Sequence, residues 1–201
     1  KRYFMSFHNG GEPKKKLTPT GEAPDNRTGT TVRFWPDSEI FKEGIDFRAT
    51  TLLERFQMMA FLNKGLEITF IDNRKNTDNK KHSYQYEGGI KDFVQHVNAS
   101  KEALFDSVGF FEEEDEDQEV EIAFQWNTGF NTDGIHSFAN GIATSEGGMH
   151  EQGFRTALTR VVNKYARDSG QLKEKDDSLQ GEDIREGLTA IISVRLREPQ
   201  F

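Results

Sequence analysis

The apolar run at residues 188–196 (LTAIISVRL) constrains the fold of this chain more than any other segment. A strand with one face in water alternates apolar and polar residues, whereas a strand covered on both faces reads as a nearly continuous β-branched run. The pattern therefore predicts a strand that is buried on both faces. With 201 residues, the chain is long enough to bury a core without disulfide bonds or a structural metal.

Helix-like and strand-like segments precede this run. Apolar residues recur at helical spacing in residues 47–63, 90–97 and 150–167, and a single helical turn is predicted at residues 181–187. Strand patterns occupy residues 2–8, 29–35, 66–72, 82–86, 107–111, 119–126 and 135–140. Turns or loops are predicted at residues 10–29, 73–81 and 170–180. This order predicts an α+β protein of two units, residues 1–88 and 89–201, that meet at Gly88 and Gly89.

Charge is distributed unevenly between the two predicted units. Residues 1–88 contain 15 basic and 12 acidic side chains, for a net charge of +3, whereas residues 89–201 contain 11 and 22, for a net charge of −11. Much of this acidity lies in residues 112–117 (EEEDED), which we expect to form a solvated hairpin tip, with a partner-docking site as the alternative. The acidic balance argues against a surface that binds nucleic acid throughout, but it allows a local basic face.

Several classes of protein and site are excluded by composition and motif content. The chain has no cysteine, which excludes disulfides, thiolate metal sites and cysteine nucleophiles. It contains no HExxH-type spacing among its five histidines, no P-loop, no G-x-G-x-x-G and no G-x-S-x-G. We therefore predict no catalytic residue and no metal ligand in this segment. The chain lacks a signal peptide and any apolar run of about 20 residues, so we expect an intracellular, soluble segment cut from a longer protein.

The predicted helix at 150–167 combines an apolar stripe with a row of cations. The stripe consists of Phe154, Leu158, Val161, Val162 and Tyr165. The basic residues that fall mostly off it are Arg155, Arg160, Lys164 and Arg167. They form either an ordinary solvated helix face or a surface for a polyanion such as DNA. Gly147 and Gly148 precede the helix and are either a turn that needs a positive φ or an anion cradle.

Six segments, in the same order along the chain, resemble the B subunits of bacterial type II topoisomerases, the family that contains DNA gyrase and topoisomerase IV. They are residues 27–37, 60–65, 86–94, 123–127, 146–155 and 183–188. The resemblance implies that residues 1–88 are the C-terminal part of a GHKL ATPase domain, the fold shared by gyrase, Hsp90 and histidine kinases. It implies that residues 89–201 are a transducer domain similar to the second domain of ribosomal protein S5, truncated before the family's phosphate-sensing lysine loop.

The same resemblance implies roles for individual residues. Thr30 matches the threonine that reaches the adenine of ATP through an ordered water, and Val32 matches an apolar wall of that adenine pocket. The family's catalytic glutamate, magnesium-binding asparagine and ATP lid have no match here, so the segment alone is expected to be inactive. ATP and Mg²⁺ are the cofactors of the full-length enzyme, and neither is expected to bind this segment tightly.

The transducer part carries the remaining implied roles. Arg155 matches an arginine that faces the cavity for the transported DNA duplex. Arg160 and Lys164 are assigned to the same cavity because they belong to the basic row of this helix. The pair Gly88 and Gly89 is a candidate hinge between the two units, with a simple turn as the alternative.

The function that the resemblance implies is that of the ATP-hydrolysing B subunit of a DNA gyrase, an isomerase that drives negative supercoiling by strand passage. Its partners would be DNA, the A subunit and a second B subunit in an A2B2 complex, in the bacterial cytoplasm. Topoisomerase IV, which decatenates DNA, is the first alternative. A non-enzymatic nucleic-acid-binding module, and a chaperone or kinase that shares only the ATPase fold, are the others.

Overall fold

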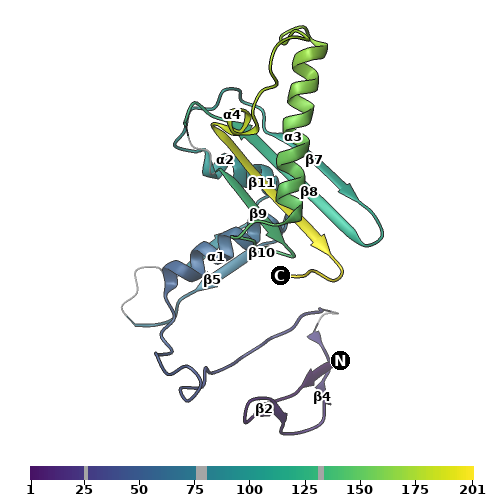
Figure 1. The fold of residues 1–201 in the computed structure, drawn as a ribbon. Coiled ribbons are helices and arrows are strands. Elements are labelled where there is room, and N and C mark those ends of the chain that lie inside the picture. The colour runs from purple at the N-terminus through teal and green to yellow at the C-terminus, as the bar shows by residue number, and fades with distance from the viewer. Residues whose placement is uncertain (25–26, 76–80, 131–133) are drawn as a thin grey trace. The chain divides into compact units, whose positions relative to one another are not determined.

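The computed structural model describes residues 1–24, 27–75, 81–130 and 134–201 (Figure 1). It divides the chain into two compact units, Lys1–Asp46 and Phe47–Phe201. Part of the predicted polar turn at 73–81, namely residues 76–80, lies outside the described residues. Among the described helices, none combines the length and the hydropathy that a membrane crossing requires.

The first unit contains two small antiparallel pairs of strands. Strand β1 (Arg2–Phe4) pairs with β4 (Thr18–Gly21), and β2 (Phe7–His8) pairs with β3 (Glu12–Pro13). Gly10 and Gly11, with φ of 75° and 138°, make the predicted turn between β2 and β3. Strand β4 was not expected, because its sequence contains a proline and a glycine and resembles a loop.

The strand predicted at residues 29–35 is wrong. Residues 27–37 belong to no helix or strand. Val32 and Trp35 are 79% and 78% exposed. A strand needs a neighbour for its N–H and C=O groups, and the described residues of this unit place none beside the segment. β-Branched and aromatic residues alone therefore did not create a strand here.

The second unit is built around a five-stranded sheet with the order β10-β9-β11-β8-β7. Its strands are β7 (Gly109–Glu114), β8 (Gln118–Trp126), β9 (Ile135–Ala139), β10 (Ile142–Ala143) and β11 (Leu188–Leu196). The central strand β11 pairs antiparallel with β8 and parallel with β9. Its first seven residues are buried, which confirms the strand predicted from the apolar run.

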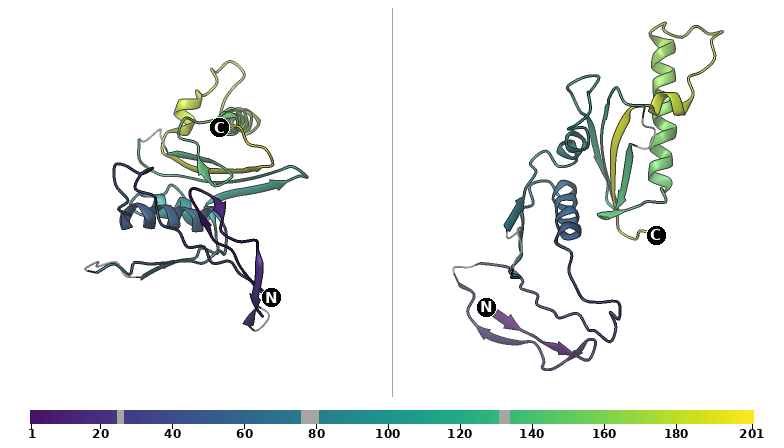
Figure 2. Two further views of the ribbon diagram at one scale, coloured as in Figure 1. Left: turned by 90° about the horizontal axis from the view of Figure 1, so that it is seen from below. Right: turned by 90° about the vertical axis from the view of Figure 1, so that its left-hand side faces the viewer.

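Helices cover both faces of this sheet (Figure 2, right). Helices α1 (Ala49–Leu62) and α2 (Ile90–Val97) lie on one face, and α3 (Met149–Asp168) lies on the other. The short α4 (Gly181–Arg185) precedes β11, and the antiparallel pair β5 (Ile68–Ile71) and β6 (Lys81–Tyr84) packs against α1. The four helices in the described part of the chain were all predicted, within two residues at their ends.

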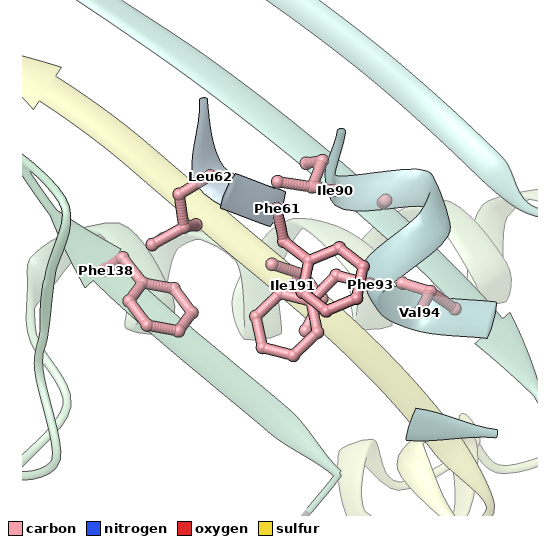
Figure 3. Close-up of a cluster of buried hydrophobic side chains, with 8 residues drawn as sticks. Phe61, Leu62, Ile90, Phe93, Val94, Phe138 and Ile191 are labelled. Carbon is pink, nitrogen blue, oxygen red and sulfur yellow. The ribbon is translucent and has the colours of Figure 1, made fainter. Parts of the chain in front are cut away.

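One hydrophobic cluster joins α1, α2 and the sheet (Figure 3). Phe61, which is 2% exposed, stacks on Tyr86 at a centroid distance of 3.7 Å and on Phe93 at 4.8 Å. Phe138 of β9 and Ile191 of β11 complete the cluster from the sheet. The residues on either side of Gly88 therefore share one core.

Helix α3 packs on the opposite face of the sheet through residues that lie four positions apart in the sequence. Phe154 and Leu158 contact a second cluster that contains Leu188 and Ile192 of β11. The predicted stripe is wrong at two positions, because Val161 and Tyr165 are 58% and 72% exposed. The end of the helix projects past the sheet (Figure 1), and there Ala166 is the buried residue instead.

The loop after α3 is held against the helix by polar contacts. Arg167 donates hydrogen bonds to the carbonyl groups of Lys173, at 2.8 Å, and Asp176, at 3.1 Å. Asn163 donates to the carbonyl group of Leu179 and accepts from its N–H. Arg167, one of the four cations noted on the helix, therefore stabilises a loop.

The acidic hairpin differs in detail from the prediction. Two strands joined by an acidic turn were expected, and β7 and β8 form them. Strand β7 nevertheless runs through Glu114, so only residues 115–117 make the turn. Asp115 closes that turn by accepting hydrogen bonds from the N–H groups of Asp117 and Gln118. The hairpin is thus stabilised by one of its own carboxylates.

Candidate functional site

A connected set of polar side chains lies where α3 begins against β9. Glu151, in the first turn of α3, accepts two hydrogen bonds on Oε1 from Arg155, from Nε at 2.9 Å and from Nη2 at 2.8 Å. Its other oxygen, Oε2, lies 2.7 Å from the hydroxyl of Ser137 in β9. That hydroxyl also lies 2.7 Å from Oγ1 of Thr144, which lies 3.2 Å from Nε2 of His150. We call these five residues the α3 polar network.

Two ionisable groups of the α3 polar network have shifted pKa values. Burial alone would raise the pKa of Glu151, but the hydrogen bonds from Ser137 and Arg155 outweigh it and hold that pKa below its ordinary value. Burial lowers the pKa of His150, and the nearby Glu151 carboxylate opposes this only in part. At neutral pH the network therefore contains an ionised carboxylate, a neutral imidazole and a guanidinium ion.

The glycine pair before α3 forms a turn. Gly147 has a φ of 78°, a conformation that favours glycine, which confirms the turn interpretation. The carboxylate of Glu151 already occupies the first turn of α3 and supplies the negative charge that a helix N-terminus favours.

The structure separates the three cations assigned to a DNA cavity. A helix turns by about 100° per residue, so Arg160 lies about 140° around α3 from Arg155, and Lys164 lies about 180° from it. Arg155 is partly covered, with 28% of its side chain exposed, whereas Arg160 is exposed. Lys164 makes an ion pair with Asp168 at 2.5 Å. Arg160 and Lys164 therefore resemble a solvated face, and Arg155 is the cation with a defined orientation.

Gly88 and Gly89 form a tight turn into α2. The N–H of Lys91 donates to the carbonyl group of Gly88 at 3.2 Å, and Gly89 between them has φ 59° and ψ −126°. These angles belong to a type II′ turn, in which this position requires glycine. Asp92 accepts a hydrogen bond from the N–H of Gly88 at 2.9 Å. The turn is therefore well defined. Its role as a hinge between the two predicted units stays a prediction.

Arg195 of β11 joins α1 to the acidic hairpin. Its Nη1 lies 2.6 Å from Glu119, and its Nη2 donates to the carbonyl group of Leu62, at the end of α1, at 3.0 Å. Carboxylate oxygens of Glu112, Glu119 and Glu121 lie within 4.8 Å of one another beside it. Burial raises the pKa of Glu121, an effect that Arg195 partly offsets. The hairpin thus serves in part to anchor α1 to the sheet.

Thr30 and Val32 lie in the irregular segment 27–37 of the first unit, and both are exposed. Their assignment to an adenine pocket stays a prediction. Sequence reasoning identified Arg155 but missed Ser137, Thr144, His150 and the role of Glu151. The spacing of four residues between Glu151 and Arg155 is the one local signal that could have suggested the ion pair.

Comparisons with known proteins agree with this fold. The structure resembles the ATPase region of gyrase B from Thermus thermophilus, solved in complex with an aminocoumarin, with a TM-score of 0.82 and 34% identity over 99% of this chain and 53% of that chain. A topoisomerase IV ATP-binding domain from Francisella tularensis has the same fold at 24% identity, with a TM-score of 0.77, over 99% of this chain and 52% of that chain. The fold is thus the one found in the ATPase regions of type II topoisomerase B subunits.

The sequence comparisons identify the family. The family model DNA gyrase B matches residues 89–201, and the chain belongs to this family. The DNA gyrase B subunit of Streptomyces coelicolor is 54% identical over 192 residues, covering 87% of this chain and 28% of that protein. Its counterpart from Streptococcus pneumoniae is 51% identical over 176 residues, covering 88% of this chain and 27% of that protein. The chain therefore spans less than a third of these relatives.

Proposed function

We propose that this chain is part of the B subunit of a DNA gyrase and acts there in the ATP-driven negative supercoiling of DNA. The observation that carries the proposal is the match of the DNA gyrase B family to residues 89–201. Because the chain covers 28% of the Streptomyces coelicolor relative, the reaction belongs to the larger enzyme. The partners would be DNA, the A subunit and a second B subunit. Topoisomerase IV is not favoured, since the relatives from Streptomyces coelicolor and Streptococcus pneumoniae are gyrase subunits.

Thr30 and Val32 have side chains suited to a contact with the adenine of ATP. The hydroxyl of Thr30 can both donate and accept a hydrogen bond, and Val32 offers apolar surface to a base. Both side chains are exposed and therefore open to a ligand. When bound, ATP supplies the free energy of the reaction. Neither residue has a group basic enough to activate water, so that task falls to groups outside this segment.

The second step of the proposal is a relay from the ATPase region to the transducer sheet. Phe61 and Leu62, at the end of α1, lie in the same cluster as α2 and the sheet strands. Arg195 adds a polar link from β11 to the carbonyl group of Leu62. Close packing transmits displacement, so a movement of α1 would carry the sheet and α3 with it. Arg155 on α3 would contact the DNA.

The proposal predicts that the segment alone is inactive and that the assembled enzyme is active. We expect the 201-residue chain alone to hydrolyse ATP no faster than a control without protein. The B subunit that contains this sequence, mixed with the A subunit, ATP and Mg²⁺, should convert relaxed circular DNA into negatively supercoiled DNA, read on an agarose gel. Decatenation without supercoiling would favour topoisomerase IV, and DNA binding without any ATP-dependent change in topology would favour a simple binding module.

The hinge prediction is tested by a matched pair of glycine variants. Gly89→Ala places a side chain at a φ of 59°, 3.2 Å from Cβ of Lys64, and should lower the free energy of unfolding by about 1–3 kcal/mol. Gly88→Ala needs no positive φ, but its Cβ would displace the Asp92 carboxylate that accepts from the N–H of residue 88, so it should cost about 0.5–1.5 kcal/mol, the value of that hydrogen bond. A hinge role predicts that Gly89→Ala also reduces ATP-dependent supercoiling at temperatures at which it stays folded. Wild-type supercoiling by folded Gly89→Ala would leave the pair as a turn only.

A further inference from the structure

The two oxygens of the Glu151 carboxylate are held from two different elements. Oε1 accepts from Nε and Nη2 of Arg155 on α3, and Oε2 contacts Ser137 on β9. Ser137 is 6% exposed, and the side chain of Glu151 is 15% exposed. A carboxylate anchored to a buried strand has few alternative rotamers. The guanidinium that it binds is therefore fixed relative to the sheet.

The donors and acceptors of the α3 polar network have one consistent direction. An ionised carboxylate only accepts, so the Ser137 hydroxyl donates to Glu151. The oxygen of Ser137 then accepts from the Thr144 hydroxyl, and Oγ1 of Thr144 accepts from Nε2 of His150. This order places the proton of the neutral imidazole on Nε2. Each member thereby orients the next, and the chain of contacts ends on the carboxylate that holds Arg155.

The guanidinium of Arg155 retains donors for a second partner. Of its five N–H groups, two point at Glu151 among the residues that the structure describes. The remaining N–H groups lie along the other edges of the planar group, and 28% of the side chain is exposed to solvent. A guanidinium edge with two parallel N–H groups matches the two oxygens of a phosphate. A fixed Arg155 therefore presents a bidentate site with a set orientation.

We propose that Glu151 is a positioning residue for Arg155: it fixes the guanidinium so that its free edge meets a DNA phosphate, and it is itself oriented by Ser137, Thr144 and His150. This inference rests on the proposed DNA contact of Arg155. A positioning role and a purely electrostatic role of Glu151 predict opposite effects on DNA contact when its charge is removed. If Glu151 acted only through its charge, removing that charge would strengthen DNA contact. If Glu151 positions Arg155, removing the charge lowers productive contact although the net positive charge increases.

The test uses the full B subunit assembled with the A subunit and compares Glu151→Gln, Ser137→Ala, Arg155→Ala and the control Glu182→Gln. Glu182 is an exposed first-turn acid of α4. The measurements are DNA-stimulated ATP hydrolysis and the dependence of DNA affinity on salt concentration. Glu151→Gln should reduce the DNA-stimulated rate roughly tenfold, because the amide oxygen that replaces the carboxylate binds Arg155 without the charge that strengthens the hydrogen bonds, and keep the salt slope of the unaltered enzyme. Arg155→Ala should reduce the rate as well and flatten that slope by about 0.9.

The variants separate the DNA contact of Arg155 from the positioning role of Glu151. Ser137→Ala should also reduce the rate. The double variant Ser137→Ala with Glu151→Gln should be no slower than Glu151→Gln alone, because both substitutions act on one chain of contacts. An Arg155→Ala enzyme that matches the unaltered one would overturn the proposed DNA contact. A slow Arg155→Ala with a fast Glu151→Gln would overturn the positioning role alone. If Glu151→Gln is unstable on thermal unfolding, the rate of Ser137→Ala decides the question.

Discussion

Replacing Phe61 with alanine should lower the free energy of unfolding of the second unit by about 3–5 kcal/mol, the range measured for truncating a buried phenylalanine. Phe61 is 2% exposed and lies between Tyr86 and Phe93, with ring centroids at 3.7 and 4.8 Å. Both rings would border the cavity left by the truncation. The loss would be measured by urea or thermal unfolding followed by circular dichroism.

Met59→Ala on the same helix provides the control for Phe61→Ala. Met59 is 46% exposed, so its truncation should cost about 1 kcal/mol or less. Equal losses for the two variants would mean that α1 does not share a core with the sheet. In the assembled enzyme, Phe61→Ala should also weaken the coupling between ATP hydrolysis and supercoiling, because it removes the packed contact through which α1 would move the sheet.

The elements that could be predicted from the sequence are those whose pattern depends on burial alone. The run that became β11 is apolar on both sides, and its central place in the sheet follows from that burial. The helix at residues 49–62 has recurrent apolar residues and ends before Gly65, whose φ of 77° helps the chain turn. Such local signals do not require knowledge of the partner segment.

The incorrect predictions lie in segments whose structure depends on contact with another segment of the chain. Residues 29–35 have strong strand propensity, yet the described part of the first unit offers them no strand to pair with. Val161 and Tyr165 continue the apolar pattern of α3 but are exposed, on a helix whose C-terminal end projects past the sheet (Figure 1). In both cases the residue type was read correctly, and the missing neighbour changed the result.

In the candidate site, too, a residue with a local signal could be predicted and its distant partners could not. Arg155 was singled out because the resemblance and the basic face of α3 both pointed to it. Its fixed geometry depends on Ser137, which lies 18 residues earlier in the chain on β9. Contacts between a helix and a strand leave no periodic trace in a sequence, so the α3 polar network could not be predicted.

A second buried group, formed by four polar side chains, has the same non-local origin. Asn98, at the end of α2, donates to Gln125 at 3.0 Å, and its Oδ1 accepts from Thr189 at 2.6 Å and from Asn127 at 3.3 Å. All four side chains are at most 5% exposed. Gln125 and Asn127 belong to the segment 123–127 that resembles the topoisomerase family, and in this structure they bind α2 to β8 and β11.

Asn98→Leu should therefore destabilise the second unit by about 3–5 kcal/mol. Leucine has a similar volume, but it leaves three buried polar partners with a lost hydrogen bond, and each unsatisfied group costs about 1–3 kcal/mol. The control is Gln85→Leu, since Gln85 is exposed and its hydrogen bond to the carbonyl group of Gly65, at 3.0 Å, can be replaced by water. That variant should lose about 1 kcal/mol or less.

The double variant Asn98→Leu with Thr189→Val makes the prediction specific to the network. Thr189 is fully buried, and its hydroxyl donates to Asn98. Once Asn98 is gone, removing that hydroxyl relieves an unsatisfied donor and loses only a long contact from Nδ2 of Asn127, at 3.4 Å. The double variant should therefore be less destabilised than the sum of the two single variants, by about 0.5–3 kcal/mol. Strictly additive losses in urea unfolding would contradict a connected network and would indicate that each side chain finds water instead.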